Sequence, residues 1–434
     1  MSLPKKTEPE LEQAAGGGLM HRRAFLAGGA LAVGAGAVAG LPHRAAAAGA
    51  IGPDQPLSMK TPGGPLRGYG LPSRFEEGVV RTVLQPYGEL SPGAGVSMTP
   101  LQAMHGTITP NGLHFNRSHN GVPDIDPETH KLLIHGLVDR PLMFTMDQLM
   151  RYPTMTRTLF IECSGNSFFN SNLFPEAMQV PVGMIHGLVS CAEWTGISLA
   201  ALLDEAGIKS EAKWILAEGA DAAGMSRSVP IEKCLDDAMI ALYQNGERVR
   251  PEQGYPMRLL LPGFEGNMSV KWLRRIKLTD APTHTKDETS KYSETQPDGI
   301  SRQFTYSMGV KSTITRPATG LAMQEPGLYE VTGLAWSGHG SVSKVEVSAD
   351  GGTSWAEAAL EGPVLPHALV RFRLPWQWDG GPATLQSRAH DTRGNIQPNH
   401  ADWSRQYAAG QLYHCNAIQS WSITADGEIK NVFI

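Results

Sequence analysis

The sequence has few cysteines, and their spacing excludes several common metal and redox sites. Its 434 residues include four: Cys163, Cys191, Cys234 and Cys415. None of them forms a CxxC pair, so the chain has neither a CxxCH haem-attachment motif nor a zinc-ribbon pattern. A redox centre in this protein would therefore not be a c-type haem of its own. Spacing leaves open whether Cys191, Cys234 or Cys415 form disulfides.

Motifs for nucleotide binding and serine hydrolysis are also missing. The chain has no GxxxxGK[ST] phosphate loop, no GxGxxG after a strand and no GxSxG nucleophile elbow. Its net charge is −5, and no basic block is interleaved with aromatic residues, so we expect no nucleic-acid partner. The composition, 41% hydrophobic and 18% charged, is ordinary for a globular protein, and the length allows two or three domains.

The N-terminal region has the features of an export leader. The run His21-Arg22-Arg23-Ala24-Phe25-Leu26 precedes an Ala/Gly-rich stretch and small residues up to Ala48. This order is typical of a signal peptide, and the paired arginines indicate the twin-arginine type. Alanine and glycine make residues 24–41 poorly apolar, so a membrane anchor is the less favoured alternative. We expect residues 1–48 to be a twin-arginine signal peptide that sends the protein to the periplasm.

The rest of the chain divides into three parts by its composition and predicted secondary structure. Residues 49–105 are rich in Pro and Gly and predict an irregular arm. Residues 106–300 mix strands and helices without regular βαβ alternation, which indicates the α+β class. Residues 301–434 contain short strands and turns, with a hairpin signal at Ala349-Asp350-Gly351-Gly352. This spacing suggests an immunoglobulin-like sandwich.

Cys163 is the candidate for a reactive side chain. An apolar, β-prone run at 158–161 leads into the turn Ser164-Gly165-Asn166. A sheet behind the thiol would hold it in place, and the glycine leaves room for a bulky group. These features suit a metal-ligating or nucleophilic sulfur, although a single free cysteine is more often a small buried hydrophobe.

Histidines and cations give weaker signals. His114 and His119, like His130 and His135, are five residues apart, which places the members of each pair on opposite faces of a strand and disfavours a zinc site. An anionic cofactor would need several cationic side chains to converge. The candidates for this role are Arg117, Arg258 and Lys271.

A series of short motifs resembles the sulfite oxidase family of molybdenum enzymes, from about residue 115 to the C-terminus. The series is Phe115-Asn116-Arg117-Ser118-His119, Cys163-Ser164-Gly165-Asn166, Glu218-Gly219-Ala220-Asp221, Gly254-Tyr255-Pro256-Met257-Arg258, Val270-Lys271-Trp272-Leu273 and Ala335-Trp336-Ser337-Gly338. The resemblance implies an α+β fold, with a mixed α/β molybdopterin-binding catalytic domain followed by an all-β immunoglobulin-like dimerisation domain. It also implies a homodimer formed through that second domain.

The resemblance assigns roles to individual residues. Cys163 would be the thiolate ligand of the metal in a molybdenum–molybdopterin cofactor. Tyr292, Arg117 and, in weaker context, Arg371 would serve the substrate side of the site. The residues expected to hold the cofactor are Phe115, Arg117, His119, Cys163, Asp221, Arg258, Ser269, Val270 and Lys271.

Departures from the family pattern bear on the substrate. Arginines that commonly follow Gly-Asn are replaced by Ser167-Phe168, and a histidine before the Gly-Tyr-Pro segment is replaced by Gln253. Less positive charge is poorly suited to free sulfite, a small dianion, and favours a larger, less charged sulfur compound.

The resemblance is strongest to the sulfane dehydrogenase branch of the family, the SoxC type. The shared features are the leader, the Cys163 turn and the tail that begins at Tyr413. They imply oxidation of sulfane sulfur on a carrier protein of SoxYZ type, with electrons passing to a separate c-type cytochrome subunit of SoxD type. The alternatives are a free sulfite dehydrogenase, a methionine-sulfoxide reductase subunit and a non-catalytic binding protein.

Overall fold

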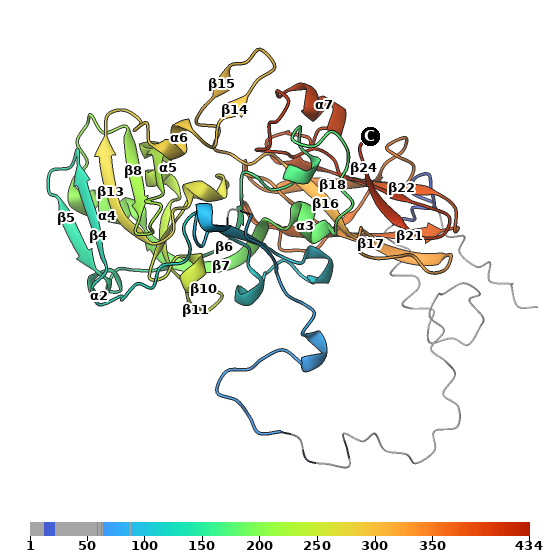
Figure 1. Cartoon of the computed structure of the whole chain (residues 1–434), viewed down its shortest axis with the longest axis horizontal. Coiled ribbons are helices and arrows are strands. Elements are labelled where there is room, and N and C mark those ends of the chain that lie inside the picture. The colour runs from blue at the N-terminus through green and yellow to red at the C-terminus, as the bar shows by residue number, and fades with distance from the viewer. Residues whose placement is uncertain (1–12, 22–58, 60–61, 63, 87) are drawn as a thin grey trace, which may run out of the picture.

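The computed structural model describes residues 13–21, 59, 62, 64–86 and 88–434. The predicted signal peptide lies outside the described residues except for 13–21. Nowhere in the described part does a helix have the length and apolar character needed to cross a membrane. Two β-rich domains lie side by side, the first on the left of Figure 1 and the second on the right.

The first domain contains two five-stranded sheets. One has the order β11 (Glu247–Arg248), β10 (Met239–Gln244), β7 (Val189–Ser198), β6 (Met155–Glu162), and β12 (Arg258–Leu260) also pairs with β10. The other has the order β5 (Leu142–Thr145), β4 (Lys131–Gly136), β13 (Leu273–Thr279), β8 (Trp214–Gly219), β9 (Ser226–Pro230). Among the described strands of these two sheets, only β13 and β4 pair in parallel. The repeated crossovers of an α/β sheet are therefore missing from this part of the chain, and the α+β class is confirmed.

Short helices connect these strands. They are α2 (Met146–Leu149), α3 (Val182–His186), α4 (Leu199–Ala206), α5 (Ile231–Asp236) and α6 (Lys286–Thr289). Thr145 caps α2 with a full capping box, because its side chain accepts from the Gln148 N–H while the Gln148 side chain accepts from the Thr145 N–H. Gly207 ends α4 with a positive φ of 72°, a conformation that glycine adopts at little cost.

Part of the predicted irregular arm is a sheet. The strand β2 (Gly95–Met98) pairs on one side with β1 (Thr82–Leu84) and on the other with β3 (Asn116–Ser118), which gives a sheet of three antiparallel strands. The arm is therefore structured from β1 onwards, and it supports the strand that carries Arg117.

The second domain is a sandwich of two antiparallel sheets, as predicted. The first sheet has the order β16 (Lys311–Arg316), β17 (Gly327–Trp336), β21 (Val370–Trp378), β20 (Ala359–Leu360). The second has the order β19 (Ala356–Glu357), β18 (Val342–Ser348), β22 (Ala383–Asp391), β23 (Ser420–Ile423), β24 (Ile429–Val432). The predicted hairpin is confirmed, because Val347 pairs with Ala356 across residues 349–352. The hairpin β14 (Glu294–Thr295)–β15 (Ser301–Arg302) precedes this domain, and α7 (His400–Arg405) lies beside it.

A shared apolar cluster joins the two domains next to Cys163. Phe160 on β6 and Cys191 on β7 are buried together with Leu334 and Trp336 on β17. The Phe160 N–H also donates to the His367 carbonyl, 2.8 Å away. Both domains therefore fix the end of β6, the strand that leads into Cys163.

Candidate active site

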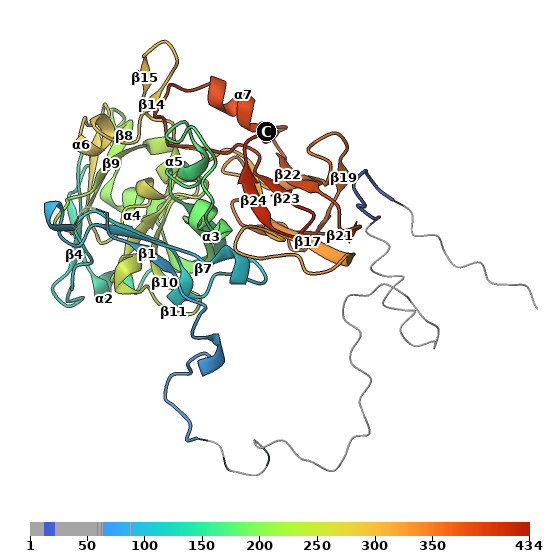
Figure 2. The same cartoon turned by 45° about the vertical axis from the view of Figure 1, so that its right-hand side comes forward.

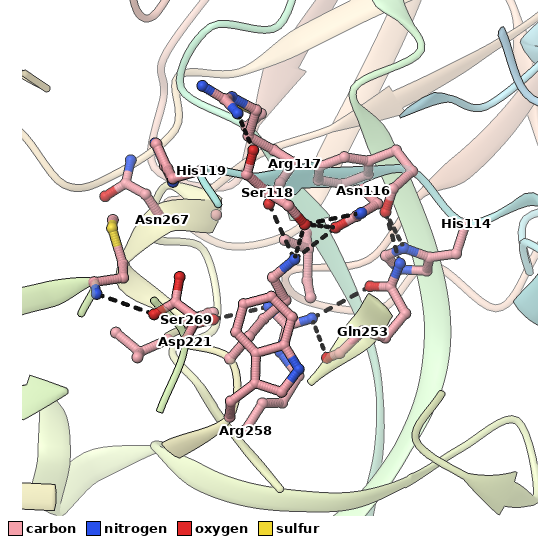
Figure 3. A pocket seen from close by; sticks show the side chains of 18 of the residues that line it. His114, Asn116, Arg117, Ser118, His119, Asp221, Gln253, Arg258, Asn267 and Ser269 are labelled. Carbon is pink, nitrogen blue, oxygen red and sulfur yellow. Dashed lines mark hydrogen bonds between the residues drawn. The ribbon is translucent and has the colours of Figure 1, made fainter. Parts of the chain in front are cut away.

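One pocket of the first domain gathers the residues predicted to hold a cofactor. It encloses about 650 Å³ of space, its open mouth included, between β3, the end of β6 and the segments around β12 and β13. All nine predicted cofactor residues line it, and so does Tyr292. Segments far apart in sequence converge here, as the side chains in Figure 3 show. Lining residues that were not predicted include His114, Asn116, Asn267 and Trp272.

The Cys163 thiol is presented by a tight turn. The Cys163 N–H donates to the Leu188 carbonyl (2.9 Å), and the Asn166 N–H donates back to the Cys163 carbonyl (2.8 Å). Burial raises the pKa of the thiol. A nearby metal cation would offset this effect, because cysteine binds metals as the thiolate.

The side chain of Glu162, the residue directly before Cys163, holds this turn in place. Its carboxylate is fully buried and accepts hydrogen bonds from Asn166 Nδ2 (2.9 Å), Lys311 Nζ (3.0 Å) and Trp336 Nε1 (2.6 Å). Lys311 and Trp336 belong to the second domain. That domain therefore helps to position the candidate metal ligand.

Buried cations form the inner wall of the pocket. Arg258 donates to the carbonyls of Gln253 (3.1 Å) and Ser269 (2.8 Å), whereas its Nε has no partner. Lys271 Nζ donates to Asn116 Oδ1 (2.5 Å) and to the Arg117 carbonyl (3.0 Å). In the described part of the chain neither cation has a carboxylate within ion-pair distance.

Burial makes these cations costly. It lowers the pKa of Arg258 to about 9 and the pKa of Lys271 well below its usual value, and in Lys271 repulsion from Arg258 adds to the effect. An anionic group bound between them would supply the missing opposite charge.

Tyr292 and His119 form a second feature of the pocket. Their Oη and Nε2 atoms lie 3.0 Å apart. Burial and the nearby Arg117 lower the pKa of His119 to about 3, so the imidazole is neutral at physiological pH. The Tyr292 ring lies 4.9 Å from the Arg227 guanidinium, which is buried and paired with Glu265 and Glu288. The tyrosine hydroxyl and the neutral imidazole are thus held at the pocket wall.

Arg371 does not line this pocket, and its role on the substrate side stays a prediction. It lies on β21 in the second domain, where its guanidinium donates to the carbonyls of Gly106 (3.0 Å) and Met104 (3.1 Å). These contacts satisfy the charge locally and tie the arm to the sandwich.

The positions Ser167 and Phe168 also lie behind the pocket wall rather than on it. Ser167 is buried, with its Oγ 2.7 Å from His186 Nδ1, and the Phe168 ring packs against Phe169 at 4.0 Å between centroids. Gln253, by contrast, lines the pocket and donates to the Phe115 carbonyl (2.8 Å).

The other metal and disulfide hypotheses find no support in the geometry. Among the residues that the structure describes, His, Cys, Asp and Glu side chains nowhere gather in a group of three or more that could hold a metal ion. All four cysteines are free thiols, and Cys191, Cys234 and Cys415 are buried.

Comparisons with known proteins agree with this site. Residues 119–286 match the model of the oxidoreductase molybdopterin binding domain, and residues 302–421 match that of the Mo-co oxidoreductase dimerisation domain. The sulfane dehydrogenase SoxCD of Paracoccus pantotrophus is a similar solved structure, with a TM-score of 0.83 and 41% identity; the match covers 88% of this chain and 100% of that chain. The chain belongs to the sulfite oxidase family of molybdenum oxidoreductases. The resemblance seen in the sequence is thereby confirmed.

Other members of the sulfite oxidase family share less of their length with this chain. Mitochondrial sulfite oxidase of Mus musculus is 32% identical over an alignment 320 residues long, and the match covers 68% of this chain and 58% of that protein. Nitrate reductase [NADH] 1 of Phaseolus vulgaris is 30% identical over an alignment 364 residues long, and the match covers 73% of this chain and 40% of that protein. The chain thus spans about two fifths of the length of this plant relative.

The pocket fits the molybdenum–molybdopterin cofactor that its domain indicates. Polar atoms on its wall are buried without a partner, namely His114 Nε2, Arg258 Nε and Asn267 Oδ1. Unpaired groups of this kind carry a free-energy cost that a polar ligand can offset. The cations suit the phosphate of the pterin, and the Cys163 thiol at the same wall offers a soft ligand for the metal.

Proposed function

We propose that the protein oxidises sulfane sulfur bound to a carrier protein and passes the electrons to a c-type cytochrome subunit. The observation that carries this proposal is the convergence in one pocket of the Cys163 thiol, the buried cations Arg258 and Lys271, and polar atoms without a hydrogen-bond partner. The similarity to SoxCD at 41% identity supports the choice of substrate within the family.

In this proposal Cys163 is the protein ligand of the metal. Arg258 and Lys271 would balance the charge of the pterin phosphate, and Asp221 would accept hydrogen bonds from the pterin. Carbonyl partners hold both cations from behind, so little reorganisation is needed when the cofactor binds. When bound, molybdenum supplies the oxygen-atom chemistry and takes up the electrons, while water is the oxygen source.

The substrate side of the pocket favours a sulfur compound of low charge. Tyr292 presents a hydroxyl and His119 a neutral imidazole, and Asn267 has an unpartnered amide oxygen. These groups bind by hydrogen bonds, whereas a free dianion is held best by several cations. Of the three cations that line the pocket, Arg258 and Lys271 are assigned to the cofactor, which leaves Arg117 for the substrate.

The cellular setting is also part of the proposal. A twin-arginine leader would deliver the folded protein to the periplasm, where a carrier of SoxYZ type and a cytochrome of SoxD type would meet it. The matched dimerisation domain supports a homodimer formed through residues 302–421.

The alternative within the same family is a free sulfite dehydrogenase. We expect purified holoenzyme with cytochrome c to turn over the carrier-bound sulfane at least about tenfold faster, in kcat/KM, than free sulfite. A carrier whose cysteine is alkylated serves as the control and should give no turnover. Brisk turnover of sulfite without any carrier would contradict the substrate assignment and leave the metal assignment intact.

A further inference from the structure

Residues 13–21, which precede the paired arginines, pack on the second domain. They form a small hairpin in which Gln13 bridges to Met20, and Leu19 bridges to Trp376 on β21. Figure 2 shows this dark blue segment beside the sandwich, next to β21 and β19. Leu19 is 0% exposed and Met20 is 5% exposed, so these two side chains are buried as thoroughly as the core of the domain, whereas Gln13, Gly17 and His21 stay exposed.

The contact is strand pairing. The Gln377 N–H donates to the Gly18 carbonyl (2.7 Å), and the Met20 N–H donates to the Pro375 carbonyl (3.0 Å). Trp376 Nε1 donates to the Gly17 carbonyl (2.6 Å). Main-chain pairing with an exposed sheet edge is a general mode of peptide recognition.

The edge that accepts this segment is left open by the short strand β20. One side of β21 pairs with β17 along its whole length. On the other side β20 covers only Arg373 and Phe372. Residues 375–377 therefore present unpaired main-chain groups that residues 18–20 satisfy.

Two glycines of the segment lie too close to the second domain to carry a side chain. Gly18 has φ +86°, and a Cβ there would lie 1.9 Å from the Gln377 carbonyl oxygen. Gly17 has φ +68°, and its Cβ would lie 2.8 Å from the Ala349 Cβ. A side chain at Gly18 would therefore prevent the pairing, since backbone cannot move aside as a flexible side chain can.

We propose that the free edge of β21 is a binding site for the leader of this chain, and that residues 13–21 occupy it once the sandwich has folded. Arg22 and Arg23 follow the docked segment directly in sequence. The docked segment ends at His21, and in our proposal the folding of the second domain controls access to the paired arginines that follow it in sequence. This inference concerns the precursor and does not rest on the proposed substrate.

Trypsin cleavage after Arg22 in the full-length precursor tests the proposal. Residues 19–21 must enter the protease cleft for this cut, so cleavage requires the docked segment to open. We expect Gly18→Val to speed the cut at least about tenfold, which corresponds to about 1.4 kcal/mol of lost docking. Gln13→Ala changes an exposed side chain of the same segment and should leave the rate unchanged.

Amide exchange provides a second readout that does not depend on the protease. In Gly18→Val the Gln377 amide should lose protection, whereas the Leu374 amide, which lies opposite Val331 of β17, should keep it. Loss at both positions would mean that the domain itself had opened. Unchanged cleavage and unchanged Gln377 exchange in Gly18→Val, or wild-type cleavage as fast as in the urea-unfolded chain, would overturn the proposal.

Discussion

Removing the charge of Glu162 should destabilise the protein strongly, because the carboxylate compensates a buried lysine. Lys311 is 2% exposed at its side chain and lies 3.0 Å from Glu162 Oε1. Breaking a buried ion pair from one side costs about 3–5 kcal/mol, since the remaining charge is left without a partner. Lys311, Asn166 and Trp336 all donate to this carboxylate. In Glu162→Gln the side-chain NH2 group, itself a donor, would therefore face another donor.

The loss should appear as a lower thermal midpoint. For a domain of this size about 1 kcal/mol corresponds to roughly 2–4 °C, so Glu162→Gln should lower the midpoint by roughly 6–20 °C. Differential scanning calorimetry measures this shift. Glu361→Gln is the matched control, because Glu361 pairs with Arg373 at the surface and such pairs contribute less than about 1 kcal/mol.

The double variant Glu162→Gln/Lys311→Met separates charge from shape. Removing both charges leaves no uncompensated ion, so the midpoint should recover by a large part of the loss. A midpoint for Glu162→Gln within 2 °C of that of Glu361→Gln would refute the reasoning, as would a double variant that is no more stable than Glu162→Gln.

Three further predictions concern the cofactor and pH. Arg258→Met should reduce the pterin content of the purified protein severalfold, because a cation of the inner wall is lost; unchanged pterin fluorescence after oxidation would contradict this role. Burial opposes charge on His414, but its hydrogen bond to Glu265 prevails and raises its pKa. The protonated form therefore stabilises the fold below the ordinary pKa of about 6.5, and this stability is lost as pH rises through the higher folded pKa. The thermal midpoint of His414→Gln should lose that slope, and an unaltered slope would exclude His414 as its source. Burial would raise the pKa of Glu346, yet hydrogen bonds from partners such as Arg388 lower it to about 2. The carboxylate thus stabilises the fold above pH about 4.5 and loses this effect as pH falls towards 2, so Glu346→Gln should flatten the acid side of the stability profile by roughly 1–2 kcal/mol. An acid profile that matches wild type would contradict it.

Local features of the fold could be predicted because neighbouring residues determine them. The hairpin around residues 349–352 depends on a few adjacent residues of its turn. Mixed strands and helices without regular alternation likewise indicated the α+β class. The strands of the arm were missed, since β1 and β2 are short and pair with a strand across an intervening Pro- and Gly-rich segment.

The site was identified through family motifs, because its residues come from distant segments. The spacing of Arg117, Cys163 and Lys271 in the sequence does not predict that they lie close together, yet the structure places all three in the lining of one pocket. The residues that support the Cys163 turn could not be predicted from the sequence for the same reason. Lys311 and Trp336 are 149 and 174 residues away from Glu162, and no local pattern marks such contacts.

Arg371, by contrast, matched a family position but does not line the pocket. Its alternation with apolar residues on β21 fits a side chain that points away from the sandwich core. The arm covers that face, and the carbonyls of Met104 and Gly106 satisfy the guanidinium there. A charged residue can therefore be buried for structural reasons that a motif comparison does not show.

The molybdenum content of Cys163→Ala tests the central claim most directly. Cys191→Ala is the matched control, because Cys191 lies opposite Phe160 on the neighbouring strand and is fully buried. Both variants are purified as folded protein from cells supplied with molybdate, and the metal is measured per chain by mass spectrometry. We predict that Cys191→Ala retains the molybdenum content of wild type, whereas Cys163→Ala loses most of it. Equal molybdenum content in the two variants would contradict the assignment of Cys163 as the metal ligand.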